Sequence, residues 1–293
     1  MLDLVDTSGF HGLGSDWSGE NQCILELGVS IPIWIETALL LGETPVWKAT
    51  DRAAFAGWLA EQVFPKVAWA SRVRRNNWGA AGSLAASLVA RYVNGVVPQL
   101  TEVAPSALTL SPAAAAQQHD AQQLLRIGTS WRGDSSCAVY GIQDHGGIPD
   151  ELRRGAGGCN ATFIPSATDT GLTYQTMQVE LLVFHAEAMR RNGDLALYQA
   201  KTSQGAPAIL QALLFVIANP TGQSWPWEGS RWGTLITAAS FYDNAALATA
   251  ARADSTFRGG RTLPYTRITA RPVAPTPSDA LLLGVPGKPF IVN

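Results

Sequence analysis

Apolar residues recur at helical spacing along most of the chain. Phe55, Leu59 and Val63 lie four residues apart, which places them on one face of a helix. Asn192 and Gly193 follow the longest such stretch, and these residue types end many helices in the left-handed conformation. The pattern predicts helices over residues 31–41, 51–63, 77–92, 112–125, 173–191, 206–218, 232–242 and 244–252.

The predicted ends of these helices carry ordinary start signals. Pro32 and Pro112 suit the first turn of a helix, and Thr50 or Asp51 would cap the second helix. Strand signals are sparse, with short candidates only at residues 137–142 and 265–270.

Successive helices joined by polar loops, without sustained heptads, favour an α/α toroid over a coiled-coil bundle. The sequence shows no internal repeat of fixed length, so a repeat protein is not indicated. We therefore expect one all-α domain over residues 1–293, built as an (α/α)n toroid or incomplete barrel. Its loops would be long and irregular, and its tail from residue 262 is rich in proline.

Charge excludes several classes of partner. The formal net charge is −2 and no basic run occurs, so neither nucleic acid nor an anionic membrane surface is expected to bind. The apolar run 23–41 contains Glu26, Pro32 and Glu36, which argues against a membrane-spanning helix. The N-terminal residues lack the basic and apolar regions of a signal peptide.

Cysteine and histidine spacing predicts no metal and no cofactor. Cys23, Cys137 and Cys159 match no metal-site pattern, and the four histidines are scattered. A disulfide between Cys137 and Cys159 would require an oxidising compartment, and the sequence leaves that pairing open. The ten tryptophans suit core packing or a groove in which sugar rings stack.

Three polar islands stand out in this weakly charged chain. The first holds Asn76 and Asn77 at a predicted helix start, where one asparagine would cap the helix and the other would keep a free amide. The second covers residues 144–155, and its bland interpretation is a solvated turn with local ion pairs. Within it, Glu151 and Arg154 have the spacing to pair, which would fix the guanidinium for a carboxylate.

The third island is Tyr174-Gln175, predicted to open the longest helix. A tyrosine there is more often a packing residue, so its hydroxyl matters only if it converges with the other islands. His185 follows Tyr174 by eleven residues on nearly the same helix face. We interpret His185 as a core or supporting residue.

Together the islands resemble the alginate lyase domain of the α/α-toroid polysaccharide lyases. The stretches that carry the resemblance are Asn76-Asn77-Trp78, Pro149-Asp150-Glu151-Leu152-Arg153-Arg154-Gly155 and Leu172-Thr173-Tyr174-Gln175, with later similarity around Trp227, Trp232 and residues 263–265. The resemblance implies β-elimination of a 4-linked uronate polymer such as alginate or glucuronan, by a secreted or periplasmic enzyme.

The resemblance also implies roles for individual residues. Asn77 and Arg154 would bind and neutralise the substrate carboxylate, and Glu151 would orient Arg154. Tyr174 would protonate the glycosidic oxygen, and would also act as base in a syn elimination. The expected substrate-binding residues are Asn76, Trp78, Glu151, Gln175 and Trp232.

The sequence departs from the family pattern at two places, and the first leaves the base for anti elimination unassigned. Trp78 stands where relatives carry histidine, and His145 is the candidate replacement. Residues 156–171 are inserted before the tyrosine helix, as a lid, as a substrate wall, or as a sign that the arginine is misaligned. The alternatives are a toroid glycoside hydrolase using two of Asp144, Asp150 and Glu151, or a non-catalytic protein that binds acidic polysaccharide.

Overall fold

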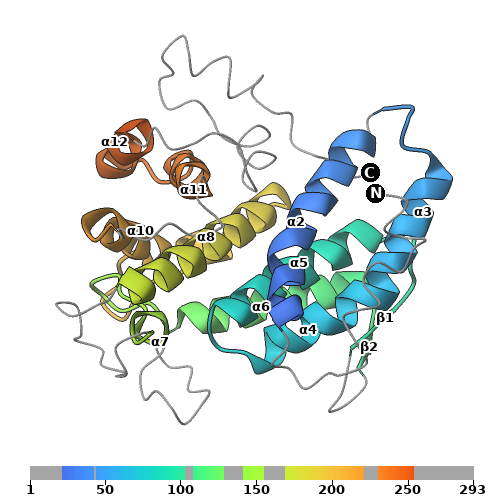
Figure 1. Cartoon of the computed structure of the whole chain (residues 1–293), viewed down its shortest axis with the longest axis horizontal. Coiled ribbons are helices and arrows are strands. Elements are labelled where there is room, and N and C mark those ends of the chain that lie inside the picture. The colour runs from blue at the N-terminus through green and yellow to red at the C-terminus, as the bar shows by residue number, and fades with distance from the viewer. Residues whose placement is uncertain are drawn as a thin grey trace. The chain divides into compact units, whose positions relative to one another are not determined.

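The computed structural model describes residues 22–42, 44–102, 108–128, 141–154, 169–220 and 230–253. Most of these residues are helical, which confirms the all-α class (Figure 1). The chain divides into two compact units, Met1–Gln123 and Leu124–Asn293, and each is described by itself below. The toroid arrangement and the single domain remain predictions.

Helix α5 is the centre of the first unit, where it packs against α2, α3 and α4. The described elements of the first unit are α2 (Gln22–Gly42), α3 (Ala49–Trp58), the π-helix η2 (Leu59–Val63), α4 (Phe64–Val73), α5 (Asn77–Val93), β1 (Leu100–Thr101), β2 (Thr109–Leu110) and α6 (Pro112–Ile127), whose last turn belongs to the second unit.

Small residues let α5 approach its neighbours closely. A side chain at Gly82 would place its Cβ 2.6 Å from both the Ser71 nitrogen and the Val67 oxygen of α4. A side chain at Gly28 would place its Cβ 2.8 Å from the Ala81 Cβ. The alanine-rich sequence of α5 therefore encodes tight backbone contact as well as helix propensity.

The helix predicted over residues 31–41 begins earlier, at Gln22, so the predicted start at Pro32 was wrong. Pro32 lies inside α2 and lacks the N–H that would bond to the carbonyl four residues before it. Buried apolar residues before and after the proline, including Ile24, Leu27 and Ile35, keep the helix continuous through this defect.

The helix predicted over residues 51–63 is present as α3 followed by η2. Its cap residue is Lys48 rather than Thr50 or Asp51, and the lysine side chain makes no capping bond. The helical path then continues into α4, which was not predicted. Pro65 does not break it, because proline is tolerated in the first turn of a helix.

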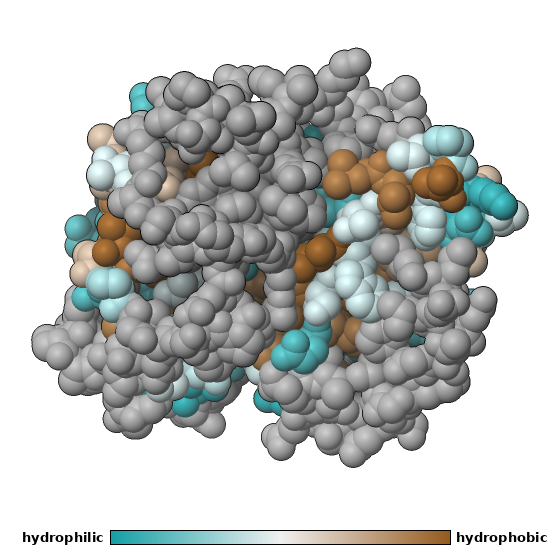
Figure 2. Space-filling model, turned by 45° about the horizontal axis from the view of Figure 1, so that its top comes forward, coloured by the Kyte–Doolittle hydropathy of each residue, from teal (hydrophilic) through white to brown (hydrophobic). Residues whose placement is uncertain are grey.

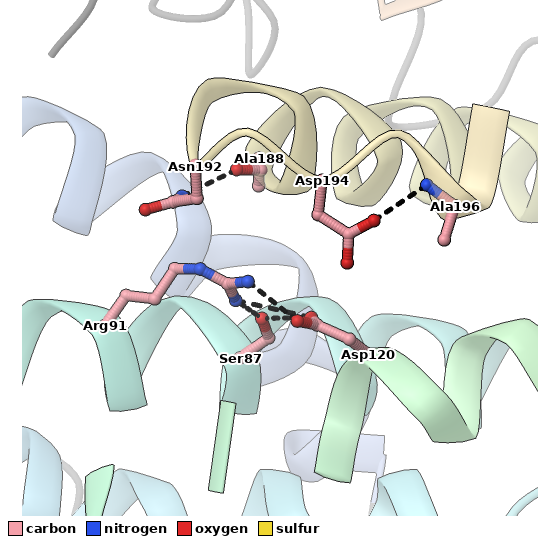
Figure 3. Close-up of polar contacts among 7 residues, drawn as sticks. All are labelled: Ser87, Arg91, Asp120, Ala188, Asn192, Asp194 and Ala196. Atoms are coloured by element: carbon pink, nitrogen blue, oxygen red, sulfur yellow. Dashed lines mark hydrogen bonds and ion pairs between the residues drawn. The ribbon is translucent and has the colours of Figure 1, made fainter. Parts of the chain in front are cut away.

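A polar cluster ties α5 to α6 within the first unit (Figure 3). The two nitrogens of the Arg91 guanidinium lie against Asp120, with Nη2 at 2.7 Å from Oδ2. Ser87 donates to the other Asp120 oxygen at 2.7 Å and also accepts from Arg91. Asp120 is only 6% exposed, so Ser87 and Arg91 compensate for the cost of removing its carboxylate from water.

In the second unit, α8 is the helix against which α7, α9, α10 and α11 pack. The described elements are α7 (Pro149–Leu152), α8 (Asp169–Arg191), α9 (Ala196–Gln199), α10 (Ala208–Ala218), α11 (Ser230–Ala239) and α12 (Ala245–Ala253). These helices and the helices predicted from the sequence agree in number and order from residue 169 onward, except for the short α9.

Helix α8 starts at Asp169, before the predicted position 173, and ends as predicted. Gly193 has a φ of 83°, and the Asn192 amide donates to the Ala188 carbonyl at 2.8 Å (Figure 3). Asp194 then accepts from the Ala196 N–H at 2.8 Å and opens α9 (Figure 3). Asn192 and Gly193 therefore terminate the helix for the reasons expected from their residue types.

The strands observed are not the strands predicted from the sequence. The two short strands observed, β1 and β2, pair antiparallel with Leu100 opposite Leu110, and neither was predicted. Two-residue strands are too short to show alternation of apolar and polar residues. Residues 137–140 and 265–270 lie outside the described residues, and residues 141–142 are not in a strand.

One segment of α2, Ile24–Gly42, is long and apolar enough to cross a membrane by length and composition, and 56% of it is buried in the protein. Glu36, which lies within this segment, is also buried in the protein and is 1% exposed. On the face drawn in Figure 2, the coloured residues include both hydrophobic and hydrophilic ones next to each other. The most exposed large apolar side chains come from separate stretches of the chain: Leu40, Val46, Val73, Val96, Leu108 and Leu125.

Candidate functional site

Two of the predicted catalytic residues meet in the second unit. Tyr174 is half-buried in the second turn of α8, and Arg154 follows the short helix α7. The Arg154 Cζ lies 5.1 Å from the centroid of the Tyr174 ring, within the range of a cation–π contact. The contact brings a guanidinium and a phenol together from positions twenty residues apart.

The segment before Arg154 is a buried helical turn and not a solvated one, although it does contain a local ion pair. Pro149 occupies the first turn of α7, where its missing N–H costs nothing. Glu151 is fully buried, and its carbonyl accepts from the Arg154 N–H at 3.1 Å. An ion pair within this turn joins Asp150 to Arg153, with Oδ1 at 2.7 Å from Nε.

This ion pair gives the two neighbouring arginines different surroundings. Arg153 is held by a carboxylate three residues before it, whereas the Arg154 guanidinium lies against an aromatic ring. A guanidinium can stack on a ring face through its plane while its N–H groups point outward from its edge. The cation–π contact therefore places the Arg154 guanidinium beside the phenol that the sequence also selected.

The loop before α7 presents His145. The Gly146 N–H donates to the Gln143 carbonyl at 2.8 Å, and the Gln143 N–H donates to the Gly147 carbonyl at 2.9 Å, which closes a tight turn. His145 is exposed at this turn, with its ring 6.0 Å from that of Phe215. A side chain at Gly147 would place its Cβ 2.5 Å from the His145 Nε2, so glycine makes room for the imidazole.

The charge state of His145 suits a proton acceptor. Partial desolvation of the ring lowers the pKa of His145 below its usual 6.5, and the neighbouring Asp144 carboxylate opposes this effect. The Ser203 hydroxyl, which donates to Asp144 at 2.6 Å, is the main cause that lowers the pKa of Asp144. The Gln204 N–H donates to the same carboxylate at 2.9 Å.

Gln175 lies beneath this loop. It is fully buried, its side-chain oxygen accepts from the Ile148 N–H at 2.9 Å, and its nitrogen donates to the Gly146 carbonyl at 3.0 Å. Gln175 was predicted to bind substrate, and in the structure its amide binds the backbone of the second polar island.

The first island belongs to the other unit. Asn76, not Asn77, caps α5, and its side-chain oxygen accepts from the Trp78 N–H at 3.1 Å. Asn77 is therefore the second amide of the pair, and it is fully buried. The Arg74 Cζ lies 5.1 Å from the Trp78 ring and 5.5 Å from the Trp69 ring, so Trp78 packs against a cation.

Some predicted residues lie outside what the structure describes. Trp232 is in α11, but its side chain is outside the described residues, as are Cys137 and Cys159. His185 is fully buried, in agreement with its interpretation as a core or supporting residue.

Sequence reasoning missed a buried polar network in the first unit. The His119 Nδ1 lies 2.8 Å from the Ser71 hydroxyl, and its Nε2 lies 3.2 Å from Glu102. Arg72 pairs with the same carboxylate at 2.7 Å. The types Ser, His and Glu suggest a nucleophilic triad, but Ser71 is fully buried and also bonded to Ser83, so the network stabilises the fold.

The carboxylates considered for a glycoside hydrolase are occupied in other ways. Asp144 is bonded to Ser203 and Gln204, Asp150 to Arg153, and Glu151 is fully buried. Inverting and retaining hydrolases both need two carboxyl groups that reach the same glycosidic bond. Within the described residues, no group of three or more His, Cys, Asp or Glu side chains is placed to hold a metal ion.

Comparison with protein-family models, with curated proteins and with solved structures found no match to this chain. The candidate site therefore rests on the geometry of Arg154, Tyr174 and the His145 loop, which all belong to the second unit. Asn76, Asn77 and Trp78 belong to the first unit and are described there by themselves.

Proposed function

We propose that the protein is a polysaccharide lyase that cleaves a 4-linked uronate polymer by β-elimination. The observation that carries the proposal is the contact between Arg154 and Tyr174, with 5.1 Å between Cζ and the ring centroid. An acidic sugar requires a cation for its carboxylate, and elimination requires a proton donor within reach of the same sugar. Arg154 and Tyr174 supply these two groups side by side.

In the proposed reaction, Arg154 binds the uronate carboxylate and stabilises the negative charge that develops when C5 loses its proton. The electron pair of the C5–H bond forms the C4–C5 double bond, and the bond between C4 and the glycosidic oxygen breaks. Tyr174 donates its proton to the leaving oxygen. The products are a shortened chain and an unsaturated uronate.

The base has two candidates in the second unit. His145 is exposed and its lowered pKa keeps the imidazole neutral at neutral pH, which suits proton abstraction. Tyr174 itself would serve if elimination is syn, after losing its proton. Roles for Asn77 at the carboxylate, and for Asn76, Trp78 and Trp232 along the polymer, remain predictions.

The proposal extends to fold and location. A toroid arrangement of the helices would provide an open groove for a polymer, and a polymeric uronate is met outside the cytoplasm, so we propose a secreted or periplasmic enzyme. Alginate and glucuronan are the first substrates to test.

The test is the ultraviolet absorbance of the unsaturated uronate during incubation with alginate, glucuronan, pectate and glycosaminoglycans. We expect one of these polymers to give an absorbance increase, and we expect Tyr174→Phe and Arg154→Ala to abolish it. Arg153→Ala is the matched control, since this neighbouring arginine is held by Asp150 and should retain most of the activity.

The outcomes separate the alternatives. New reducing ends without the absorbance would indicate a hydrolase, since hydrolysis creates no double bond. Binding of the polymer without turnover, unchanged in Tyr174→Phe, would indicate a non-catalytic binding protein. Full activity in either Tyr174→Phe or Arg154→Ala would overturn the proposal.

A further inference from the structure

The Gln175 amide links α8 to the loop that leads to Arg154. Its two bonds go to backbone atoms on either side of Gly147, the Gly146 carbonyl and the Ile148 N–H. Both bonds are buried, and the residue is fully buried. A buried amide with both polar atoms paired in this way fixes the backbone that it bonds, because breaking either bond leaves a buried polar atom unsatisfied.

The bonded backbone atoms lie between the proposed functional groups. Gly146 directly follows His145, and Ile148 is the residue that caps α7, whose end leads to Arg154. Tyr174, which contacts Arg154, directly precedes Gln175 on α8. One side chain thus links the helix of the phenol to the segments of the imidazole and the guanidinium.

The loop around Gly146 also contacts the backbone of α10. Gly146 has a φ of 90°, and a side chain there would place its Cβ 2.1 Å from the Gln211 carbonyl oxygen of α10. Gly146 is therefore confined between the backbone of α10 and the amide of Gln175. The loop has little freedom to move while both contacts hold.

We propose that Gln175 is a positioning residue, which sets the places of His145 and Arg154 relative to Tyr174 and does not itself bind substrate. The inference rests on the proposed lyase function for its effect on catalysis. Displacement of reacting groups by about 1 Å lowers rates by about a hundredfold. Because Gln175 holds the backbone next to His145 and before Arg154, its loss should lower kcat.

The experiment uses the full-length chain with Gln175→Leu, Gln175→Glu and a matched control, Gln178→Leu. Gln178 is also in α8 and is 3% exposed, so its replacement tests the effect of losing a buried amide from the same helix. Three quantities are measured: thermal midpoint, kcat and KM per folded enzyme, and hydrogen exchange of peptides covering residues 141–154.

We expect Gln175→Leu to lose about tenfold or more in kcat with a smaller change in KM, and exchange across residues 141–154 to rise about tenfold. Gln178→Leu should leave both unchanged. Gln175→Glu keeps the acceptor for Ile148 and loses the donor to Gly146 until its carboxyl is protonated. Its activity relative to the original protein should therefore recover as the pH is lowered.

The outcomes distinguish this inference from the proposed function. If Tyr174→Phe is inactive but Gln175→Leu retains kcat and loses only thermal stability, Gln175 is merely structural and the inference fails. If no uronate polymer is cleaved, the lyase proposal fails, and the exchange measurement decides the positioning role by itself. Equal exchange in Gln175→Leu and Gln178→Leu would refute it.

Discussion

At the scale of single residues, the second polar island shows how buried contacts assign different roles to similar side chains. Arg153 and Arg154 are adjacent and identical in type, yet one is paired with Asp150 and the other lies on Tyr174. The sequence predicted the charge cluster and selected Arg154 by resemblance. It did not predict that Asp150 would hold Arg153, because two candidate pairs with the same spacing were available.

The His145 imidazole provides a prediction at this scale. Asp144 raises the pKa of His145 against the lowering effect of desolvation, so Asp144→Asn should lower that pKa further. We expect the shift to be small, since the ring is exposed and solvent and salt screen the interaction. Titration of the imidazole by NMR measures it.

Asp194→Asn is the control, because this carboxylate accepts from Ala196 at the start of α9 and is not among the causes of the His145 shift. A rise in the pKa of His145 in Asp144→Asn would contradict the prediction. The sign also fixes a stability trend. The folded state binds this proton less tightly than the unfolded chain, so His145 contributes stability above pH 6.5 that is lost as the pH falls below it.

At the scale of elements, glycine has opposite consequences in two neighbouring helices. Gly82→Ala in α5 would bring a Cβ within 2.6 Å of two backbone atoms of α4, which cannot move aside as a side chain would. We expect a loss of about 1–3 kcal/mol in the free energy of unfolding. Gly57→Ala in α3 meets nothing within 4 Å, and should gain about 0.5–1 kcal/mol from helix propensity.

Urea denaturation followed by circular dichroism compares the two glycine variants. Opposite shifts of the urea midpoint are expected, downward for Gly82→Ala and upward for Gly57→Ala. A stable Gly82→Ala protein would mean that α4 and α5 are less closely packed than the structure has them.

The link between α5 and α6 provides a second element-scale prediction. Asp120→Asn removes the charge that Arg91 contacts while keeping the side-chain shape. We expect a loss of about 1–3 kcal/mol in the free energy of unfolding, since the carboxylate is nearly buried and accepts from two side chains. Asp51→Asn at the surface of α3 should change it by less than about 0.5 kcal/mol. Equal effects of both variants would argue against a stabilising role for the pair.

At the scale of the whole molecule, helix type and order were predictable from the sequence and some helix boundaries were not. Helices α5, α6 and α8 were predicted to within four residues of their observed ends. Pro32 misled the prediction of the α2 start, since burial carries the helix through it. Pro65, which the prediction did not use, lies in the first turn of α4, where proline is tolerated. Local sequence reports propensity, whereas these boundaries were decided by packing.

The sequence predicted the site residues only where polar or charged side chains stand out in a weakly charged, apolar chain. Arg154 and Tyr174 were selected as functional, and the structure brings them together. Gln175 was selected as substrate-binding by the resemblance, and its two observed bonds go to backbone atoms 27 and 29 residues before it, which the sequence did not predict. The His119 network could not be predicted, because Ser71 and Arg72 of α4, Glu102 after β1 and His119 of α6 share no sequence motif.

The weak net charge leads to a prediction about the entire protein and its polymer. With a formal charge of −2, the protein has no long-range attraction for a polyanion, and only local groups such as Arg154 favour binding. Added salt screens the overall repulsion at distances beyond about 8 Å and affects a close guanidinium–carboxylate pair less. We therefore expect KM for the uronate polymer to stay level or to fall slightly when NaCl is raised to physiological ionic strength.

The salt dependence of KM, with kcat and thermal stability recorded in the same buffers, measures this effect. Enzymes that hold polyanions on a broad cationic surface show the reverse, because each released counterion weakens binding as salt rises. A KM that increases about tenfold or more over this range would mean that a cationic surface, and not a few local groups, captures the polymer. A level KM together with an inactive Arg154→Ala would place recognition at a single guanidinium on a nearly neutral protein.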